Sequence, residues 1–358
     1  MNDVEDQPAA TKATMTVPRA PERRQRQERI HARKPAASDD ATDLDAVAGT
    51  VQRWFSRDAL TALMGEPVSE AQRVGLDWLL TGGKRWRPLL TAAVFEAAGG
   101  DIEKISAAAV AVECFHKASL IHDDIEDGDS ERYGVPTVHA RIGVPAAINV
   151  GDYLIGEGYR LLAASDFSDS VRAGMSLAAA CGHRELCLGQ GDELAFCRCP
   201  APVTEQTALR IYGQKTASAF EVAVMVGAVA AGVDASVRAQ LSAFSQAAGT
   251  AYQIQDDMED FRSVRGRAAD LLAMRPTLFL AVACASEHPA VRLALGAVWD
   301  GDAAGRERLI EAIAEAGLHT RVESLYAHYK HEAERVLSGI PHTGLKCLLR
   351  RIMAGMLR

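Results

Sequence analysis

The stretch CFHKASLIHDDIEDGDSERYG, residues 114–134, places a dense group of acidic residues at the end of an apolar helix. A helix has 3.6 residues per turn, so Asp123 and Asp127 share one face, with their Cβ atoms about 5–6 Å apart. Asp124 lies beside them, roughly 100° around the axis. Carboxylates this close repel one another, and a divalent cation that prefers hard oxygen ligands, such as Mg²⁺, would compensate the repulsion.

A second segment, GTAYQIQDDMEDF at residues 249–261, repeats this pattern. Asp256, Asp257 and Asp260 have the same i, i+1, i+4 spacing and again end an apolar helix. A single acidic run is most often a solvated helix face, whereas two DDxxD motifs in one helix-rich chain indicate a pair of metal sites. We therefore predict that both acidic sets bind magnesium.

Composition limits the classes of protein that fit. The 358 residues carry a net charge of −8, which argues against a nucleic-acid-binding surface. Residues 1–42 are predicted to form a disordered basic tail, and residues 43–358 a single domain. The longest apolar run, residues 222–233, is too short to span a bilayer, so no transmembrane segment is expected.

The cysteines point to a reducing compartment. Seven cysteines without a secretory segment are expected to be reduced thiols in a cytoplasmic protein. Cys181, His183, Cys187, Cys197 and Cys199 fit no common zinc spacing, so we interpret them as buried or incidental side chains.

Helical periodicity dominates from residue 43 onward, and no convincing strand alternation is present. We predict an all-α fold of many helices around one core. Helices are expected at residues 68–80, 101–127, 146–162, 166–188, 215–232 and 235–261, with a break at 189–191 and loops at 197–202 and 262–269.

Several cations complement the acidic sets. In TGGKRWRP, residues 81–88, Lys84, Arg85 and Arg87 crowd into four positions near a helix start. This cluster is either a solvated helix end or an anion-binding site, since guanidinium and ammonium groups both bind phosphate. Lys215 begins an apolar helix and Arg132 follows the first acidic set. Two carboxylate sets with separate cations suggest a substrate that carries diphosphate.

These motifs resemble the trans-polyprenyl diphosphate synthases, the family of farnesyl and geranylgeranyl diphosphate synthases, over residues 43–358. The matching segments are GGKRWRP (82–88), ECFHKASLIHDD (113–124), PTVH (136–139), GDYL (151–154), GQGDE (189–193), KT (215–216) and YQIQDDMED (252–260). The resemblance implies the all-α isoprenoid synthase fold with a central cavity, and a homodimer.

The resemblance also implies the chemistry: a Mg²⁺-dependent prenyltransferase that condenses isopentenyl diphosphate with an allylic diphosphate and releases diphosphate. It assigns catalysis to Asp123, Asp124, Lys215, Thr216, Gln253 and Asp256. It assigns metal binding to Asp123, Asp124, Asp127, Asp256, Asp257 and Asp260, and substrate binding to Lys84, Arg87, His116, Arg132, Lys215 and Arg275.

The sequence departs from the family pattern at three places. Tyr133 stands where the family has a second arginine, which weakens the expected hold on isopentenyl diphosphate. Arg267 and Arg275 stand near the positions of two family lysines. Ala118 and Ser119 are small residues expected to leave room for a product tail, and a geranylgeranyl or longer product is predicted. Phe115 is either the floor of that space or a core aromatic.

Two alternatives remain at this point. A class I terpene cyclase would share the fold and the first acidic motif, but the complete DDMED and the GGKRWRP segment argue against it. A non-catalytic subunit of a heteromeric synthase would tend to lose aspartates, whereas both sets are intact; Tyr133 keeps this alternative open.

Overall fold

The computed structural model describes residues 42–262 and 269–357, which belong to one compact unit. The predicted tail, residues 1–42, and Arg267 lie outside the described residues except for Thr42, so the expected domain boundary stays a prediction.

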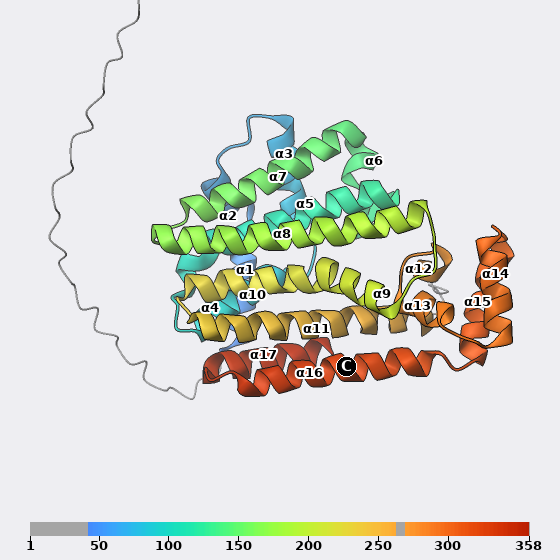
Figure 1. The fold of residues 1–358 in the computed structure, drawn as a ribbon. Helices are drawn as coiled ribbons and strands as arrows, with labels where there is room; N and C mark the ends of the chain where they lie inside the picture. Colours follow the sequence, from blue (N-terminus) through green and yellow to red (C-terminus); the bar gives the residue numbers. More distant parts are fainter. Residues whose placement is uncertain (1–41, 263–268, 358) are drawn as a thin grey trace, which may run out of the picture. The chain divides into compact units, whose positions relative to one another are not determined.

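The described residues form a succession of helices joined mostly by short turns (Figure 1). In chain order the elements are α1 (Leu44–Trp54), α2 (Arg57–Met64), α3 (Glu70–Leu80), α4 (Trp86–Ala97), η1 (Ile102–Ile105), α5 (Ser106–Asp127), β1 (Glu131–Arg132), β2 (Val135–Pro136), α6 (Val138–Ile142), α7 (Val144–Ala164), α8 (Asp169–Arg198), α9 (Glu205–Tyr212), η2 (Gly213–Ala217), α10 (Ser218–Ala230), α11 (Ala235–Arg262), α12 (Ala269–Leu272), α13 (Leu278–Cys284), α14 (Pro289–Trp299), α15 (Ala303–Glu315), α16 (His319–Gly339) and α17 (Thr343–Met356). The predicted all-α fold is confirmed.

The long helices lie side by side. In Figure 1, α8, α10, α11 and α16 run nearly alongside one another, and α5 packs against α7. Helix α10 contacts α4, α8 and α11, which makes it central to the bundle. The approach of α10 to α4 is so close that a Cβ atom on Gly227 would lie 2.4 Å from the Thr91 carbonyl oxygen, so only glycine fits there.

One antiparallel hairpin interrupts the helices of the described region. β1 pairs with β2 through Glu131 opposite Pro136 and Arg132 opposite Val135. The two residues between the strands, Tyr133 and Gly134, both have positive φ (56° and 75°), as tight two-residue hairpin turns require. Strands of two residues are too short to show an alternating pattern, which is why the sequence did not predict them.

Helix ends agree with the sequence where a cap defines them. The Thr204 hydroxyl accepts a hydrogen bond from the Thr207 backbone N–H and caps the start of α9, as threonine commonly does. The predicted break at residues 189–191 is wrong, because α8 continues to Arg198. The predicted loop at 197–202 is confirmed from residue 199 onward, since only its first two residues belong to α8. A Cβ atom on Gly189 would lie 2.7 Å from the Gln214 side chain, so this glycine permits close packing rather than ending a helix.

Lys215 does not begin a helix, contrary to the prediction. It lies in η2, a π-helical turn between α9 and α10, where the Ser218 backbone N–H donates to the Gly213 carbonyl five residues back. Such turns insert one extra residue into a helix and occur often at functional sites.

Candidate active site

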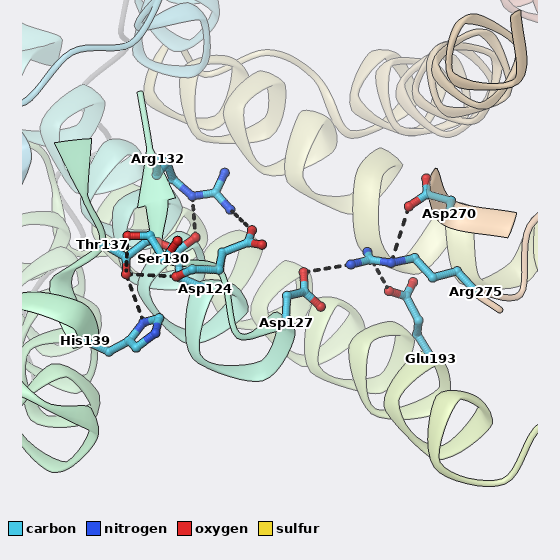
Figure 2. A network of polar contacts seen from close by, with 10 residues as sticks. Asp124, Asp127, Ser130, Arg132, Thr137, His139, Glu193, Asp270 and Arg275 are labelled. Carbon is cyan, nitrogen blue, oxygen red and sulfur yellow. Dashed lines mark hydrogen bonds and ion pairs between the residues drawn. The ribbon is translucent and has the colours of Figure 1, made fainter. Parts of the chain in front are cut away.

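The first acidic set ends α5, with Gly128 in the left-handed conformation as the C-cap (φ 71°). Asp124 is fully buried, and its Oδ1 accepts a hydrogen bond from Arg132 Nε at 2.5 Å. The hairpin returns Arg132 to this carboxylate eight residues later, and Figure 2 shows the pair. Asp123 and Asp127 remain more exposed than Asp124. The three aspartates therefore do not have equal access to a ligand.

The second set, near the end of α11, has the same asymmetry. Asp257 is buried and accepts hydrogen bonds from the Tyr212 hydroxyl and from Gln253 Nε2 (3.2 Å). The Tyr212 oxygen in turn accepts the Leu278 backbone N–H at 2.8 Å. Asp256 is exposed. As in the first set, the middle carboxylate is occupied by protein donors.

The acidic groups have perturbed ionisation. Burial raises the pKa of Asp257 to about 7, and its hydrogen bonds from Tyr212 and Gln253 oppose the rise. Burial likewise raises the pKa of Asp123 to about 6, opposed by the positive charge of Lys215. The pKa of Asp256 is also raised, first by partial desolvation from the surrounding protein, although the side chain keeps exposed surface, and then by neighbouring carboxylates. Positive charge brought to this site would therefore favour the ionised carboxylates.

Arg275 links the two sets. Its guanidinium lies 3.0 Å from Asp127 Oδ2, 3.3 Å from Glu193 Oε1 and 3.3 Å from Asp270 Oδ1. Figure 2 shows Asp127 and Asp270 on opposite sides of this side chain. The Asp270 backbone N–H lies 3.4 Å from Asp260 Oδ2. Asp127 of the first set and Asp260 of the second are thus connected through Arg275 and Asp270, which brings the ends of the two sets close together.

Lys215 and Thr216 connect that network to α8 and α11. Lys215 Nζ lies 2.8 Å from Glu193 Oε2. The Thr216 hydroxyl donates to Gln253 Oε1 at 2.6 Å, and Gln253 donates to Asp257. The π-helical turn therefore directs two successive side chains to two different helices.

The predicted cationic group is divided by the structure. Arg87 Nη1 lies 3.0 Å from His116 Nε2, and Lys84 is exposed. Burial and the charge of Arg87 hold the pKa of His116 well below its usual value, so the imidazole is neutral and accepts from Arg87. Arg85 instead points into the protein and pairs with Glu113 at 2.7 Å. Of the three cations in the cluster, Arg85 is thus the one that faces the protein interior, and it is not among the residues to which the resemblance assigns substrate binding.

A cavity of about 370 Å³ adjoins these groups. Its polar lining includes Arg87, His116, Asp123, Glu126, Gln190, Lys215 and Thr216. Its apolar lining includes Val112, Phe115, Leu120, Ile155, Ala179, Leu194, Ala219 and Val222. The wall therefore combines several charged groups with a larger share of hydrocarbon, as an amphiphilic ligand requires.

The expected tail walls are only partly correct. Ser119 lines the cavity, but Ala118 is fully buried and does not. Ser119 lies four residues before Asp123 and shares its helix face, whereas the fifth residue back is rotated well away from it. Phe115 lines the cavity and packs edge-on against Tyr159, with ring centroids 4.8 Å apart. Phe115 is thus both a core aromatic and part of the cavity wall.

Sequence reasoning missed two buried polar residues. Tyr212 binds Asp257, and Lys117 binds backbone oxygens next to the cationic group. Lys117 could have been noticed as a lysine among residues predicted to be buried on α5. Tyr212 gave no comparable indication, because its partner is 45 residues away.

Within the described ranges, no three His, Cys, Asp or Glu side chains converge as a ready-made metal site. The donors nevertheless suit magnesium, which uses one or two carboxylates and completes its shell with water and phosphate oxygens. All seven cysteines are free, and no cluster supports zinc in that part of the chain. In the same ranges, no single helix is long and apolar enough to cross a bilayer, although the bent pair α13 and α14 passes by length and composition.

Comparison with known proteins identifies the class. The polyprenyl synthetase family profile matches residues 70–316, so the chain belongs to this family, as the motifs indicated. A geranylgeranyl diphosphate synthase of Methanosarcina mazei is 30% identical over 80% of this chain and 88% of that protein. A geranylgeranyl pyrophosphate synthase of Geoglobus acetivorans is 36% identical over 58% of this chain. That alignment spans 66% of the relative, and one with a short chain isoprenyl diphosphate synthase of Methanocaldococcus jannaschii spans 55%.

Solved structures agree with the fold. The geranylgeranyl pyrophosphate synthetase of Pyrococcus horikoshii has a TM-score of 0.77, at 23% identity, over 88% of this chain and 98% of that one. The synthetase of Geoglobus acetivorans has a TM-score of 0.73, at 26% identity, over 89% of this chain and all of that one. The expected isoprenoid synthase fold is therefore confirmed.

Proposed function

We propose that the protein is a chain-elongating prenyltransferase that condenses isopentenyl diphosphate with an allylic diphosphate to give a trans-polyprenyl diphosphate. The observation that carries the proposal is the cavity: hydrocarbon lines most of it, and it adjoins both the Asp123 network and the separate Arg87–His116 pair. The Asp123 network suits the diphosphate of the allylic substrate, the Arg87–His116 pair suits the diphosphate of isopentenyl diphosphate, and the hydrocarbon lining suits the prenyl tail. The relatives are named as geranylgeranyl, farnesyl and geranylfarnesyl diphosphate synthases, which favours this activity over the cyclase and partner-subunit alternatives.

Mg²⁺ is the proposed metal. Asp123, Asp127, Asp256 and Asp260 would hold it, because Asp124 and Asp257 are buried as well as hydrogen-bonded to protein donors. We propose that these two middle carboxylates hold their neighbours in place. When bound, Mg²⁺ supplies positive charge to the leaving diphosphate. A related synthase of Corynebacterium glutamicum was solved with isoprenyl diphosphate and magnesium.

The chain's own residues divide the remaining work. Lys215 and Arg275 bind the leaving diphosphate and stabilise its growing charge as the C–O bond breaks. Both residues form ion pairs with Glu193 in this structure, and a bound diphosphate would take the place of Glu193 as their partner. Thr216 and Gln253 lie beside the allylic carbon and orient the cation that forms.

Isopentenyl diphosphate is held by Lys84, Arg87 and His116 and presents its double bond to the allylic cation. The released diphosphate accepts the proton that completes the condensation. The apolar lining excludes water, which would otherwise capture the cation. Arg132, predicted to contact substrate, is proposed to position Asp124, because its guanidinium nitrogens lie against Asp124 and Asp129.

The cavity supports a geranylgeranyl or longer product. Ser119 is small and leaves the first part of the wall open, and the Phe115–Tyr159 pair limits the space farther along.

A homodimer is also proposed. Ile148 on α7 and Leu177 and Leu188 on α8 are large apolar side chains left exposed, and light scattering of the purified protein tests the dimer. The free cysteines support a cytoplasmic location.

The decisive experiment is turnover of isopentenyl diphosphate with dimethylallyl, geranyl or farnesyl diphosphate, with Mg²⁺ and with EDTA. We expect a longer prenyl diphosphate and inorganic diphosphate only with Mg²⁺. A cyclase would release hydrocarbon without isopentenyl diphosphate. A partner subunit would do nothing alone.

A further inference from the structure

Lys117 on α5 is a buried cation that the activity described so far does not use. Its side chain has no exposed surface. Nζ donates to the Thr81 carbonyl oxygen at 2.8 Å and to the Gly82 carbonyl oxygen at 3.0 Å. These two oxygens belong to the segment that joins α3 to α4. Lys117 therefore fixes a connecting segment rather than a helix.

Two aromatic rings enclose the same ammonium group. Nζ lies 4.4 Å from the ring centroid of Trp78 and 4.9 Å from that of Tyr133. Trp78 Nε1 also donates to the Lys117 carbonyl oxygen at 3.0 Å. Rings at such distances stabilise a cation without neutralising it. The two rings therefore stabilise the charged form of Lys117, and its positive charge can still act on a bound anion.

The segment held by Lys117 is irregular and leads to the cationic group. Gly83 has φ 123°, and Arg85, with φ 50°, precedes α4 without a side-chain cap. Arg85 Nη2 also donates to the Thr81 carbonyl oxygen (3.4 Å), so Lys117 and Arg85 hold the segment together. Lys84 lies between these anchors and is exposed.

The balance of charge points to an anionic ligand. Two buried cations, Arg85 and Lys117, have one buried carboxylate, Glu113, near them, and Glu113 forms its ion pair with Arg85. Among the described residues, no carboxylate forms an ion pair with Lys117. A buried cation that lacks a counter-ion is costly, so proteins keep one where a ligand or a network repays the cost. The neighbouring His116 is neutral and Arg87 is cationic, so positive charge exceeds negative charge here.

We propose that Lys117 is a positioning residue for the diphosphate group of isopentenyl diphosphate. It fixes the segment from Thr81 to Lys84 and adds positive charge beneath that segment. Tyr133 covers the ammonium from the hairpin side and keeps it dry. The proposal rests on the proposed prenyltransferase function, since it assigns one of the two diphosphates to this end of the site.

The test is steady-state kinetics and calorimetry of Lys117→Met and Lys117→Gln. Methionine keeps a similar apolar length without charge or donor, and glutamine keeps a donor without charge. We expect Lys117→Met to raise the KM for isopentenyl diphosphate at least tenfold, with the KM for the allylic diphosphate changed less than twofold. Lys117→Gln should fall between Lys117→Met and the wild type. Tenfold corresponds to about 1.4 kcal/mol of binding free energy.

A matched control is Lys330→Met. Lys330 also donates to a backbone oxygen, that of Leu357 at 3.2 Å, and its Nζ lies 5.6 Å from the Tyr326 ring centroid, but it is on α16. This variant should leave both KM values unchanged.

Three results would overturn the proposal: an unchanged KM for isopentenyl diphosphate in a folded Lys117 variant, an equal rise in both KM values, or the same rise in the control. If one Lys117 variant does not fold, the other decides. If the wild type shows no turnover, the proposed function fails, but the dissociation constants of isopentenyl diphosphate for wild type and variants still decide the role of Lys117.

Discussion

Replacing Lys117 should change how the stability of the protein depends on pH. Burial, together with the positive charge of Arg85, lowers the pKa of Lys117 from 10.5 to about 8, and Arg132 acts in the same direction while Glu113 opposes it. A shift of this size means that burying the charged ammonium costs about 3 kcal/mol at neutral pH. Lys117→Met removes this cost but also removes the Lys117 hydrogen bonds to the Thr81 and Gly82 carbonyl oxygens, at about 1 kcal/mol each. The Thr81 oxygen keeps its bond from Arg85, and the Gly82 oxygen loses its donor.

The sign of the pH effect follows from proton counts. Between the folded pKa of about 8 and the unfolded value of 10.5, the unfolded chain binds more protons at Lys117 than the folded chain. The free energy of unfolding of the wild type therefore rises with pH in this window. From about pH 7.5 to about pH 9.5 this residue should contribute a rise of about 2 kcal/mol. Lys117→Met should lack that rise.

Urea denaturation of wild type and Lys117→Met at several pH values in this range measures the difference. The variant should be no less stable than the wild type near pH 7.5, and its relative stability should then fall as the pH increases. The Lys330→Met control should follow the wild type. A difference between wild type and Lys117→Met that does not depend on pH would refute the account of Lys117 as a buried, charged ammonium.

Three further predictions concern the cavity and the acidic sets. Ser119→Phe should shorten the product by filling part of the cavity, whereas Ala118→Phe should overpack the core and destabilise the fold by about 1–3 kcal/mol. Mass spectrometry of the products tests the first variant, and thermal unfolding tests the second. An unaltered product from Ser119→Phe would contradict its place in the cavity wall. Arg132→Met should cost about 3 kcal/mol in urea denaturation, because it leaves the buried carboxylate of Asp124 unpaired, and a loss below about 1 kcal/mol would contradict this. EDTA should abolish turnover while changing the thermal midpoint by only a few degrees, because Arg275 compensates the acidic sets without metal.

Much of the site could be predicted from sequence because it depends on local spacing. Asp123 and Asp127 share a helix face by the 3.6-residue period, and the same rule places Ser119 on the cavity side. The same rule should have excluded Ala118, which is five residues from Asp123. The all-α fold followed from periodicity over long segments, which is the most dependable kind of pattern.

The errors arose where tertiary contacts decide the outcome. The glycines at 189 and 191 look like a helix break, but α8 continues because Gly189 packs against the π-helical turn. Arg85 and Arg87 are two residues apart and look equivalent, yet Glu113 draws Arg85 inward while Arg87 faces the cavity. Sequence alone does not show where Glu113 lies relative to residue 85.

The π-helical turn at Gly213–Ala217 limits which single-residue deletions the protein can accept. The extra residue in that turn sets the rotation of everything after it, so removing one residue there would turn α10 by about 100° relative to α9. Either Lys215 or Thr216 would then lose its partner, while the face of α10 against α4 would also be displaced. Single-residue deletions in this turn should therefore be rejected in a library that accepts them in exposed connections, and a tolerated deletion would reveal a second way of joining α9 to α10.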